Sequence, residues 1–302
     1  MTDQPTLTDG EVTLRPSPAE DSSLSFVIER EGGTVGQCAV RLGPDGIGEL
    51  SWRLEPGHRG RGSATRAVRI LSDWALAELG QGGLGLSRIQ AHVESTNESA
   101  LRVATRSGLL REGVRRVAPS QESPGSTGLV VLARLVDDPP LSDPKAFRTL
   151  LNSFLPRKRA IGQMLIRDPD GRVLLCQLTY KADWDLPGGV VEVGESPKEA
   201  VSREVAEELG LTIPAGRLLL TDWLPPWSGW DDAVCLVFDG GVQESSVVEQ
   251  IVRQEREIRS AEFCTPEQVR ERATDFTARR VESALSNAAG TGEGYAESGR
   301  PT

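Results

Sequence analysis

Residues 187–211, PGGVVEVGESPKEAVSREVAEELGL, predict a glycine turn followed by a short helix that is rich in acids. Ser196 is a suitable N-cap, Pro197 suits the first helical position, and Glu199 completes a capping box. Gly210 then favours a C-terminal stop. The segment therefore predicts a helix that begins at about residue 197 and ends before Gly210, presented by a glycine-rich loop.

Glu204, Glu207 and Glu208 fall within one narrow arc of this helix because they are spaced i, i+3 and i+4. Neighbouring carboxylates repel one another, so a helix built only for stability would avoid this arrangement. Carboxylate oxygens at this spacing can share a hard divalent cation such as Mg²⁺, whose charge removes the repulsion. A solvated acidic face is the alternative interpretation of the triplet taken alone.

The triplet belongs to the longer pattern G-x5-E-x7-R-E-U-x-E-E-x-G-U, in which U is a bulky aliphatic residue. The chain matches this pattern without substitution, and WDLPGG at 184–189 leads into it. The stretch resembles the signature of the Nudix hydrolases, which cleave nucleoside diphosphates linked to another moiety. The matching residues are Gly189, Glu195, Arg203, Glu204, Val205, Glu207, Glu208, Gly210 and Leu211.

This resemblance implies an α/β/α sandwich with a loop–helix–loop site, a Mg²⁺ or Mn²⁺ cofactor and a nucleotide-type small-molecule substrate. Glu195 and Arg203 would tie the loop to the helix. The base that activates water would be Glu204 or Glu257, and Glu257 can equally be a surface charge. The residues that the resemblance places at the metal are Gly189, Glu204, Glu207 and Glu208.

Three tryptophans lie in a Pro/Gly-rich stretch, DWLPPWSGW, at residues 222–230. Trp223, Trp227 and Trp230 can stack a nucleobase, and they can equally pack in a core or at a domain interface.

Residues 56–75, PGHRGRGSATRAVRILSDWA, predict a glycine-rich turn between a strand and an amphipathic helix. Glycines let the backbone approach an anion, and free N–H groups at the start of a helix bind it. An ordinary strand–turn–helix is the alternative for this motif alone. The residues that would bind a diphosphate are Arg59, Gly60, Arg61, Gly62, Ser63, Ala64 and Thr65.

Residues 87–116, SRIQAHVESTNESALRVATRSGLLREGVRR, resemble the second acetyl-CoA motif of the GNAT acetyltransferases, especially those that acetylate protein N-termini. Asn97, Ser99, Gly108 and Gly113 match, while Leu109 replaces the usual Phe. With the R-x-x-G-x-A pattern of the preceding turn, the resemblance covers about residues 11–136. It implies a mixed sheet with flanking helices, bound acetyl-CoA with Asn97 at the cofactor, and an amine acceptor.

Glu49, on the strand before the turn, is the candidate base for acetyl transfer. His92, on a later strand, is a poorer candidate base, because a strand histidine is more often structural. Two departures from the GNAT pattern count against catalysis. Ala104 stands where many members carry a Tyr, and residues 15–30 are short for the two helices that usually shape the acceptor site. The alternative is therefore a non-catalytic acetyl-CoA-binding module that regulates the hydrolase.

The clearest domain boundary is DDPPLSDP at 137–144, because paired acids and three prolines cannot continue a helix or a central strand. We expect an α/β (α+β) chain with a GNAT domain at 1–136, a linker at 137–150, a Nudix domain at 151–290 and a tail at 291–302. A net charge of −10 disfavours nucleic-acid and anionic-membrane binding. Scattered cysteines, a polar acidic N-terminus and no long apolar run favour a cytoplasmic protein.

Overall fold

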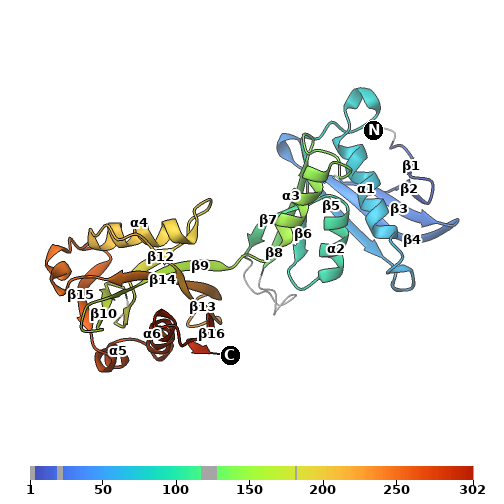
Figure 1. The fold of residues 1–302 in the computed structure, drawn as a ribbon. Coiled ribbons are helices and arrows are strands. Elements are labelled where there is room, and N and C mark those ends of the chain that lie inside the picture. Colours follow the sequence, from blue (N-terminus) through green and yellow to red (C-terminus); the bar gives the residue numbers. More distant parts are fainter. Residues whose placement is uncertain (1–3, 19–22, 117–127, 181, 302) are drawn as a thin grey trace. The chain divides into compact units, whose positions relative to one another are not determined.

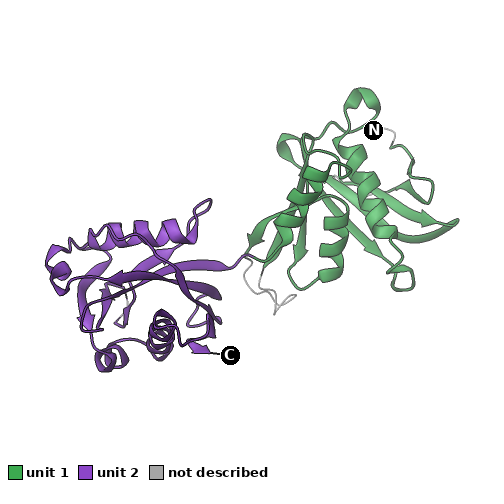
Figure 2. Ribbon diagram, viewed as in Figure 1, with its two compact units in different colours: residues 1–156 green, residues 157–302 purple. Residues whose placement is uncertain are grey.

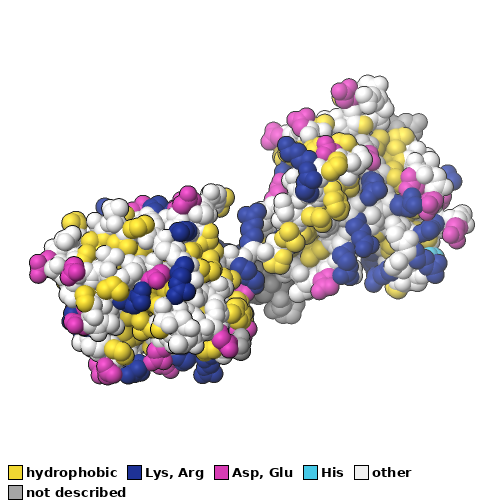
Figure 3. Space-filling model, viewed as in Figure 1, with side chains coloured by type: hydrophobic (Ala, Val, Ile, Leu, Met, Phe, Trp, Pro, Cys, Tyr) yellow, Lys and Arg dark blue, Asp and Glu magenta, His cyan; other side chains and the backbone are white. Residues whose placement is uncertain are grey.

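The computed structural model describes residues 4–18, 23–116, 128–180 and 182–301. The chain divides into two compact units, residues 1–156 and 157–302 (Figure 2). In the part of the chain that the structure describes, no helix is long and apolar enough to span a membrane. On the face of each unit that Figure 3 shows, acidic and basic side chains are interspersed with hydrophobic ones.

The N-terminal unit contains a sheet in the order β1-β2-β3-β4-β5-β6-β8-β7, in which only β5 and β6 pair in parallel (Figure 1). Its strands are β1 (Leu7–Thr8), β2 (Val12–Ser17), β3 (Ser23–Arg30), β4 (Gly33–Leu42), β5 (Ile47–Leu54), β6 (Arg88–Glu94), β7 (Leu110–Arg115) and β8 (Leu129–Leu135). Its helices are α1 (Ser63–Leu76), α2 (Glu98–Arg106) and α3 (Pro144–Phe154), with short 3₁₀ turns η1 (Pro44–Gly46), η2 (Pro56–His58) and η3 (Leu79–Gln81).

Alternation along the strands gives this sheet one apolar and one polar face. Leu14, Phe26, Val40 and Leu50 are buried on the face against which α1 packs. Successive residues on the opposite face of β2–β5 are mostly polar, and we call this the polar face. The residues on it include Arg15, Ser17, Ser23, Ser25, Gln37, Arg41, Glu49, Ser51 and Arg53, together with Val27 and Ala39.

The sequence suggested that residues 15–30 are a short connection in place of two helices. Among them, residues 15–17 end β2 and residues 23–30 form β3. Phe26 and Ile28 are fully buried, so this segment contributes to the sheet and its core. No helix lies between β2 and β3 among the residues described there; residues 19–22 fall outside them.

The expected linker at 137–150 instead includes the start of α3. Asp143 caps this helix, accepting from the Lys145 N–H at 2.7 Å, and Pro144 occupies the first helical turn, where proline is tolerated. Ala146 and Leu150 are buried against the first unit, which therefore extends to residue 156. The proline that suggested a break in the chain starts a helix.

The C-terminal unit contains a mixed sheet in the order β11-β10-β9-β14-β13-β16-β17, with β12 paired to β9 and β15 paired to β10. Its strands are β9 (Arg159–Arg167), β10 (Val173–Leu178), β11 (Trp184–Asp185), β12 (Gly188–Val190), β13 (Leu218–Leu224), β14 (Ala233–Val242), β15 (Ile258–Cys264), β16 (Tyr295–Glu297) and β17 (Arg300–Pro301). Its helices are α4 (Pro197–Leu209), α5 (Pro266–Arg272) and α6 (Asp275–Ala288), with the 3₁₀ turn η4 (Ser245–Gln250).

Helices cover both faces of this sheet, with α4 on one side and α5 and α6 on the other (Figure 1). Val201 and Val205 of α4 pack with Met164 of β9, whereas Val281 of α6 packs with Leu165, the next residue of β9. This confirms the predicted α/β/α sandwich.

The segment expected to be a tail completes the sheet as β16 and β17. Ala296 is fully buried, and Gly299 donates its N–H to Asp222 at 2.8 Å. A Cβ atom on Gly299 would lie 2.6 Å from the backbone nitrogen of Arg280, so glycine permits this close approach to α6.

Candidate active sites

Helix α4 begins and ends as its sequence predicts. The Ser196 hydroxyl accepts from the Glu199 N–H, and the Glu199 carboxylate accepts from the Ser196 N–H, each at 3.3 Å. Gly210, with φ at 68°, ends the helix in the left-handed region. These caps fix the rotation and length of the helix and so set the direction of its acidic face.

Arg203 is the cation at the centre of that face. It donates to both carboxylate oxygens of Glu195, at 2.9 and 3.1 Å, and so ties the preceding loop to α4. The same guanidinium lies 3.0 Å from Glu204 and 2.9 Å from Glu207. Arg203 holds the pKa of Glu195 below its usual range. The Glu195–Arg203 pair implied by the sequence is therefore present in the structure.

Glu208 is the buried acid of the cluster and accepts from the Gly188 N–H at 3.0 Å. Burial, together with the negative charges of Glu204 and Glu257, raises the pKa of Glu208 to about 8. Burial also raises the pKa of Glu204, and the charges of Glu207 and Glu257 add to this against the effect of Arg203. Glu204, Glu208 and Glu257 are thus close enough to repel one another.

Gly189 leaves room for the Glu204 carboxylate. A Cβ atom on Gly189 would lie 2.5 Å from the Glu204 carboxyl carbon, closer than real Cβ contacts allow. Glu257 lies immediately before β15 with an exposed side chain, and its carbonyl accepts from the Thr179 N–H at 2.8 Å. β10 and β15, which are remote in sequence from α4, therefore bring this fourth acid to the cluster.

The donor chemistry of this cluster fits a hard divalent cation: all the side-chain donors are carboxylate oxygens, they repel one another, and a glycine leaves the space beside them. The carboxylates are not already arranged as a set of metal ligands. Among the described residues, no three His, Cys, Asp or Glu side chains converge as a ready-made metal site. Arg203 and the Gly188 N–H instead supply the compensating positive charge.

Two of the tryptophans of the 222–230 stretch lie at the turn between β13 and β14. The backbones of Trp227 and Trp230 pair at 3.0 and 2.8 Å. The Trp227 ring meets Phe276 edge-on at 5.5 Å, and the Arg159 guanidinium lies 4.9 Å from the Trp230 ring centre. Both rings are about half exposed. The structure therefore gives both rings packing partners, and base stacking stays an untested prediction.

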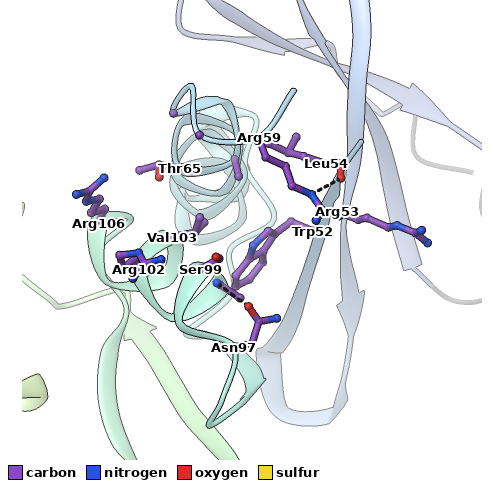
Figure 4. A pocket seen from close by; sticks show the side chains of 14 residues that line it. Trp52, Arg53, Leu54, Arg59, Thr65, Asn97, Ser99, Arg102, Val103 and Arg106 are labelled. Atoms are coloured by element: carbon purple, nitrogen blue, oxygen red, sulfur yellow. Dashed lines mark hydrogen bonds between the residues drawn. The ribbon is translucent and has the colours of Figure 1, made fainter. Parts of the chain in front are cut away.

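The N-terminal unit has a cavity of about 460 Å³ where β5 and β6 separate (Figure 4). The two strands pair only over Ile47–Glu49 and Arg88–Gln90, so the later part of β5 is open toward α2. The lining residues are Trp52, Arg53, Leu54, Arg59, Gly60, Gly62, Ala64, Thr65, Asn97, Ser99, Ala100, Arg102, Val103 and Arg106.

Six of the predicted acetyl-CoA-binding residues line this cavity: Arg59, Gly60, Gly62, Ala64, Thr65 and Asn97. Gly60 and Gly62 have φ of 77° and 80°, so glycine is required for the turn that precedes α1. Arg61 and Ser63 do not line it. The Arg61 carbonyl and the Ser63 hydroxyl instead accept from Arg30, at 2.7 and 3.2 Å.

Two further arginines, Arg102 and Arg106, line the cavity from α2 and were not singled out in the sequence. Their i, i+4 spacing on a predicted helix could have identified them in the sequence, because it places both side chains on one face of that helix. With Arg59 they supply three guanidinium groups for an anionic ligand, whereas the side chain of Arg53, the fourth arginine of the lining, points away from them (Figure 4). Asn97 caps α2, since its side-chain oxygen accepts from the Ala100 N–H at 3.1 Å.

Glu49 lies on the polar face. Its Oε1 atom forms a hydrogen bond with Nδ1 of His92, at 2.9 Å. Arg41 donates to the other carboxylate oxygen of Glu49. Although burial alone would raise it, the hydrogen bonds from His92 and Arg41 hold the pKa of Glu49 below its usual range. The two residues that the sequence offered as candidate bases, Glu49 and His92, are therefore hydrogen-bonded to each other.

A NUDIX domain model matches residues 156–284, and an Acetyltransferase (GNAT) domain model matches residues 6–110. A MutT-like protein of Streptomyces ambofaciens is 32% identical over 133 residues, which cover 43% of this chain and 77% of that protein. The nucleoside triphosphatase NudI of Salmonella agona is 40% identical over 93 residues, or 29% of this chain and 61% of the relative.

A solved GNAT-family acetyltransferase from Bacillus anthracis is 20% identical, with a TM-score of 0.33, and the match covers 37% of this chain and 66% of that one. The fold, the domain models and the matched relatives together define a Nudix-type hydrolase unit preceded by a GNAT-type unit. The chain belongs to the Nudix family, with an acetyltransferase (GNAT) domain at its N-terminus.

Proposed function

We propose that the C-terminal unit hydrolyses a nucleoside diphosphate linked to another moiety and depends on Mg²⁺ or Mn²⁺. The observation that carries the proposal is the cluster of Glu204, Glu208 and Glu257, three mutually repelling carboxylates beside the Gly188–Gly189 turn. The NudI relatives, named as nucleoside triphosphatases, support a nucleotide substrate. The chain spans 61% of the length of the NudI protein cited above, so that activity is not carried over.

In this proposal the divalent cation is held by Glu204, Glu207, Glu208 and the Gly189 carbonyl. When bound, the cation neutralises phosphate oxygens and lowers the pKa of water. Arg203 and Glu195 hold the loop against α4. We assign the proton-accepting role to Glu257 because its side chain is exposed, whereas Arg203 already engages Glu204. Glu204 is the second candidate for that role.

The first test uses the full chain and a panel of nucleoside triphosphates, nucleotide sugars and dinucleoside polyphosphates. We expect phosphate-bearing products with Mg²⁺ or Mn²⁺ and none with excess EDTA, because the uncompensated acids repel a phosphate. Products are resolved by ion-exchange chromatography. Absence of cleavage of every panel member with either cation would contradict the proposal.

Gly189→Ala is expected to reduce hydrolysis by about tenfold or more, because displacement of a site group by ~1 Å is costly. The new Cβ atom would meet the Glu204 carboxyl carbon at 2.5 Å and force that side chain to move. Val190→Ala, at the next and exposed position of β12, is the matched control. Initial rates on a substrate from the panel test this, and equal rates for the two variants would exclude a role for the close approach.

We propose acetyl transfer from acetyl-CoA to an amine as the activity of the N-terminal unit. The supporting observation is that the arginine-lined cavity and the Glu49–His92 pair both lie at the separation of β5 and β6. Release of CoA thiol that depends on an added amine tests it. The alternative, a regulatory acetyl-CoA-binding module, predicts binding without transfer and an effect of acetyl-CoA on the hydrolase rate.

A further inference from the structure

A second cavity of the N-terminal unit, of about 390 Å³, opens on the polar face. Its hollow follows from the register of the strands: Ser17, Ser25, Ala39 and Ser51 lie in one row across β2, β3, β4 and β5. Small side chains in this row leave space between longer neighbours. The residues that line the cavity are Ser17, Pro18, Ser23, Ser25, Gln37, Cys38, Ala39, Ser51, Trp52 and Arg53.

This polar cavity adjoins the arginine-lined cavity, because Trp52 and Arg53 line both. β5 loses its pairing with β6 after Glu49, so Ser51 and the residues that follow it have no partner strand on that side. A ligand in the arginine-lined cavity and a ligand in the polar cavity would therefore meet across one unpaired segment of β5.

Arg53 supplies an unpaired positive charge to the polar cavity. It is exposed and, in the part of the chain that the structure describes, forms no hydrogen bond or ion pair. Figure 4 shows its side chain pointing away from the arginine-lined cavity and from Asn97 and Ser99 of the facing segment. An anionic group in the polar cavity is the partner that this guanidinium lacks.

The Glu49–His92 pair lies beside the cavity and does not line it: Ser23 of the cavity lining lies opposite Arg41, and Arg41 lies opposite Glu49. Glu49, Ser51 and Arg53 are alternate residues of one strand, so Glu49 and Arg53 each lie about 7 Å along β5 from Ser51. His92 Nδ1 lies 2.9 Å from Glu49, and among the described residues the other ring nitrogen of His92 forms no hydrogen bond. With the Nδ1 proton directed at the carboxylate, Nε2 has the available lone pair.

We propose that the polar cavity is the acceptor site for acetyl transfer and takes a small amine that also carries a carboxylate or phosphate group. The acidic group binds Arg53, and the amine lies toward Glu49 and His92. The inference rests on the acetyl transfer proposed above and names its substrate class. A polyamine fits poorly, because a second cationic group would face Arg53.

The reaction balances with these groups. The ammonium of the acceptor loses one proton to His92 Nε2, which Glu49 orients, and the resulting amine attacks the thioester carbonyl of acetyl-CoA. The C–N bond forms and the C–S bond breaks. The nitrogen then gives a second proton to the departing thiolate, so that CoA leaves as its thiol, and keeps the third as the amide N–H. Glu49 is in this scheme a positioning residue.

The test measures CoA thiol release by the full chain with four acceptors: glutamate, O-phosphoserine, benzylamine, which carries no acidic group, and spermidine. We expect transfer to an acidic amine, with glutamate and O-phosphoserine separating carboxylate from phosphate. Arg53→Gln should raise the KM for the acidic amine by about tenfold or more while kcat changes little. Arg15→Gln is the matched control, because Arg15 lies on the same face, pairs with Glu29 and does not line the cavity.

Arg53→Glu gives a second, opposite readout: the preference should shift from the acidic amine toward spermidine. Equal use of spermidine and acidic amines by the parent protein, unchanged in Arg53→Gln, would overturn the acceptor assignment and leave acetyl transfer standing. If no amine is acetylated, the proposed acetyl transfer is contradicted. Titration calorimetry of the CoA-loaded chain with glutamate and O-phosphoserine then tests separately whether the polar cavity binds acidic amines. Binding that does not depend on Arg53 would then overturn the site itself.

Discussion

Glu204→Gln is expected to lower metal-dependent hydrolysis by about 10²- to 10⁴-fold, the range associated with loss of one charged catalytic group. Glutamine keeps the size of the side chain and still fits beside Gly189. It loses the negative charge that faces Glu208 and Glu257 and that a divalent cation would require. Initial rates of cleavage, measured at saturating Mg²⁺ and again over a Mg²⁺ titration, test the prediction.

Glu199→Gln is the matched control for that experiment. It makes the same chemical change on the same helix, and glutamine at this position still completes the capping box. Arg203 keeps Glu195 and Glu207 as partners in Glu204→Gln, so the loop stays tied to α4 and the fold, checked by circular dichroism, should be unchanged. Full activity of Glu204→Gln at every Mg²⁺ concentration would contradict the site assignment.

Local signals in the sequence were enough to predict the elements that hold the acids. The caps of α4 depend on residues within one helix length, and the i, i+3, i+4 spacing of the carboxylates places them on one face whatever packs around them. The glycine turn before α1 was predictable for the same reason, because Gly60 and Gly62 adopt positive φ. Interactions between residues that are close in the sequence determine features of this kind.

Contacts between distant segments were not predictable in this way. Glu257 meets the acidic face only because β15 pairs with β10, and nothing within the segment around residue 257 specifies that pairing. The row that forms the polar cavity depends on the register of four strands, and a shift of one residue would replace Ser25 by Leu24 or Phe26. Pro144 and the glycines after residue 290 suggested a break and a tail, yet tertiary packing placed them in α3 and beside β16.

Arg280 forms a buried charge cluster that sequence patterns did not predict. It lies on α6 with 1% exposure and donates to Asp222, which is fully buried, at 2.7 Å, and to Gln163 at 3.1 Å. Arg280→Met is expected to destabilise the C-terminal unit by about 3–5 kcal/mol, because it leaves the Asp222 charge buried without its partner. Urea unfolding of the full chain, followed by tryptophan fluorescence, measures this as an earlier transition of that unit.

A second variant separates the lost charge balance from lost packing. Asp222→Asn combined with Arg280→Met removes both charges, and the asparagine oxygen can still accept from the Gly299 N–H. Because the single variant is penalised by an uncompensated buried charge, the double variant should regain much of the lost stability. If Arg280→Met and the double variant unfold at the same urea concentration, the guanidinium acts through its packing against Phe276, 5.7 Å from the ring centre, and the charge pair contributes little.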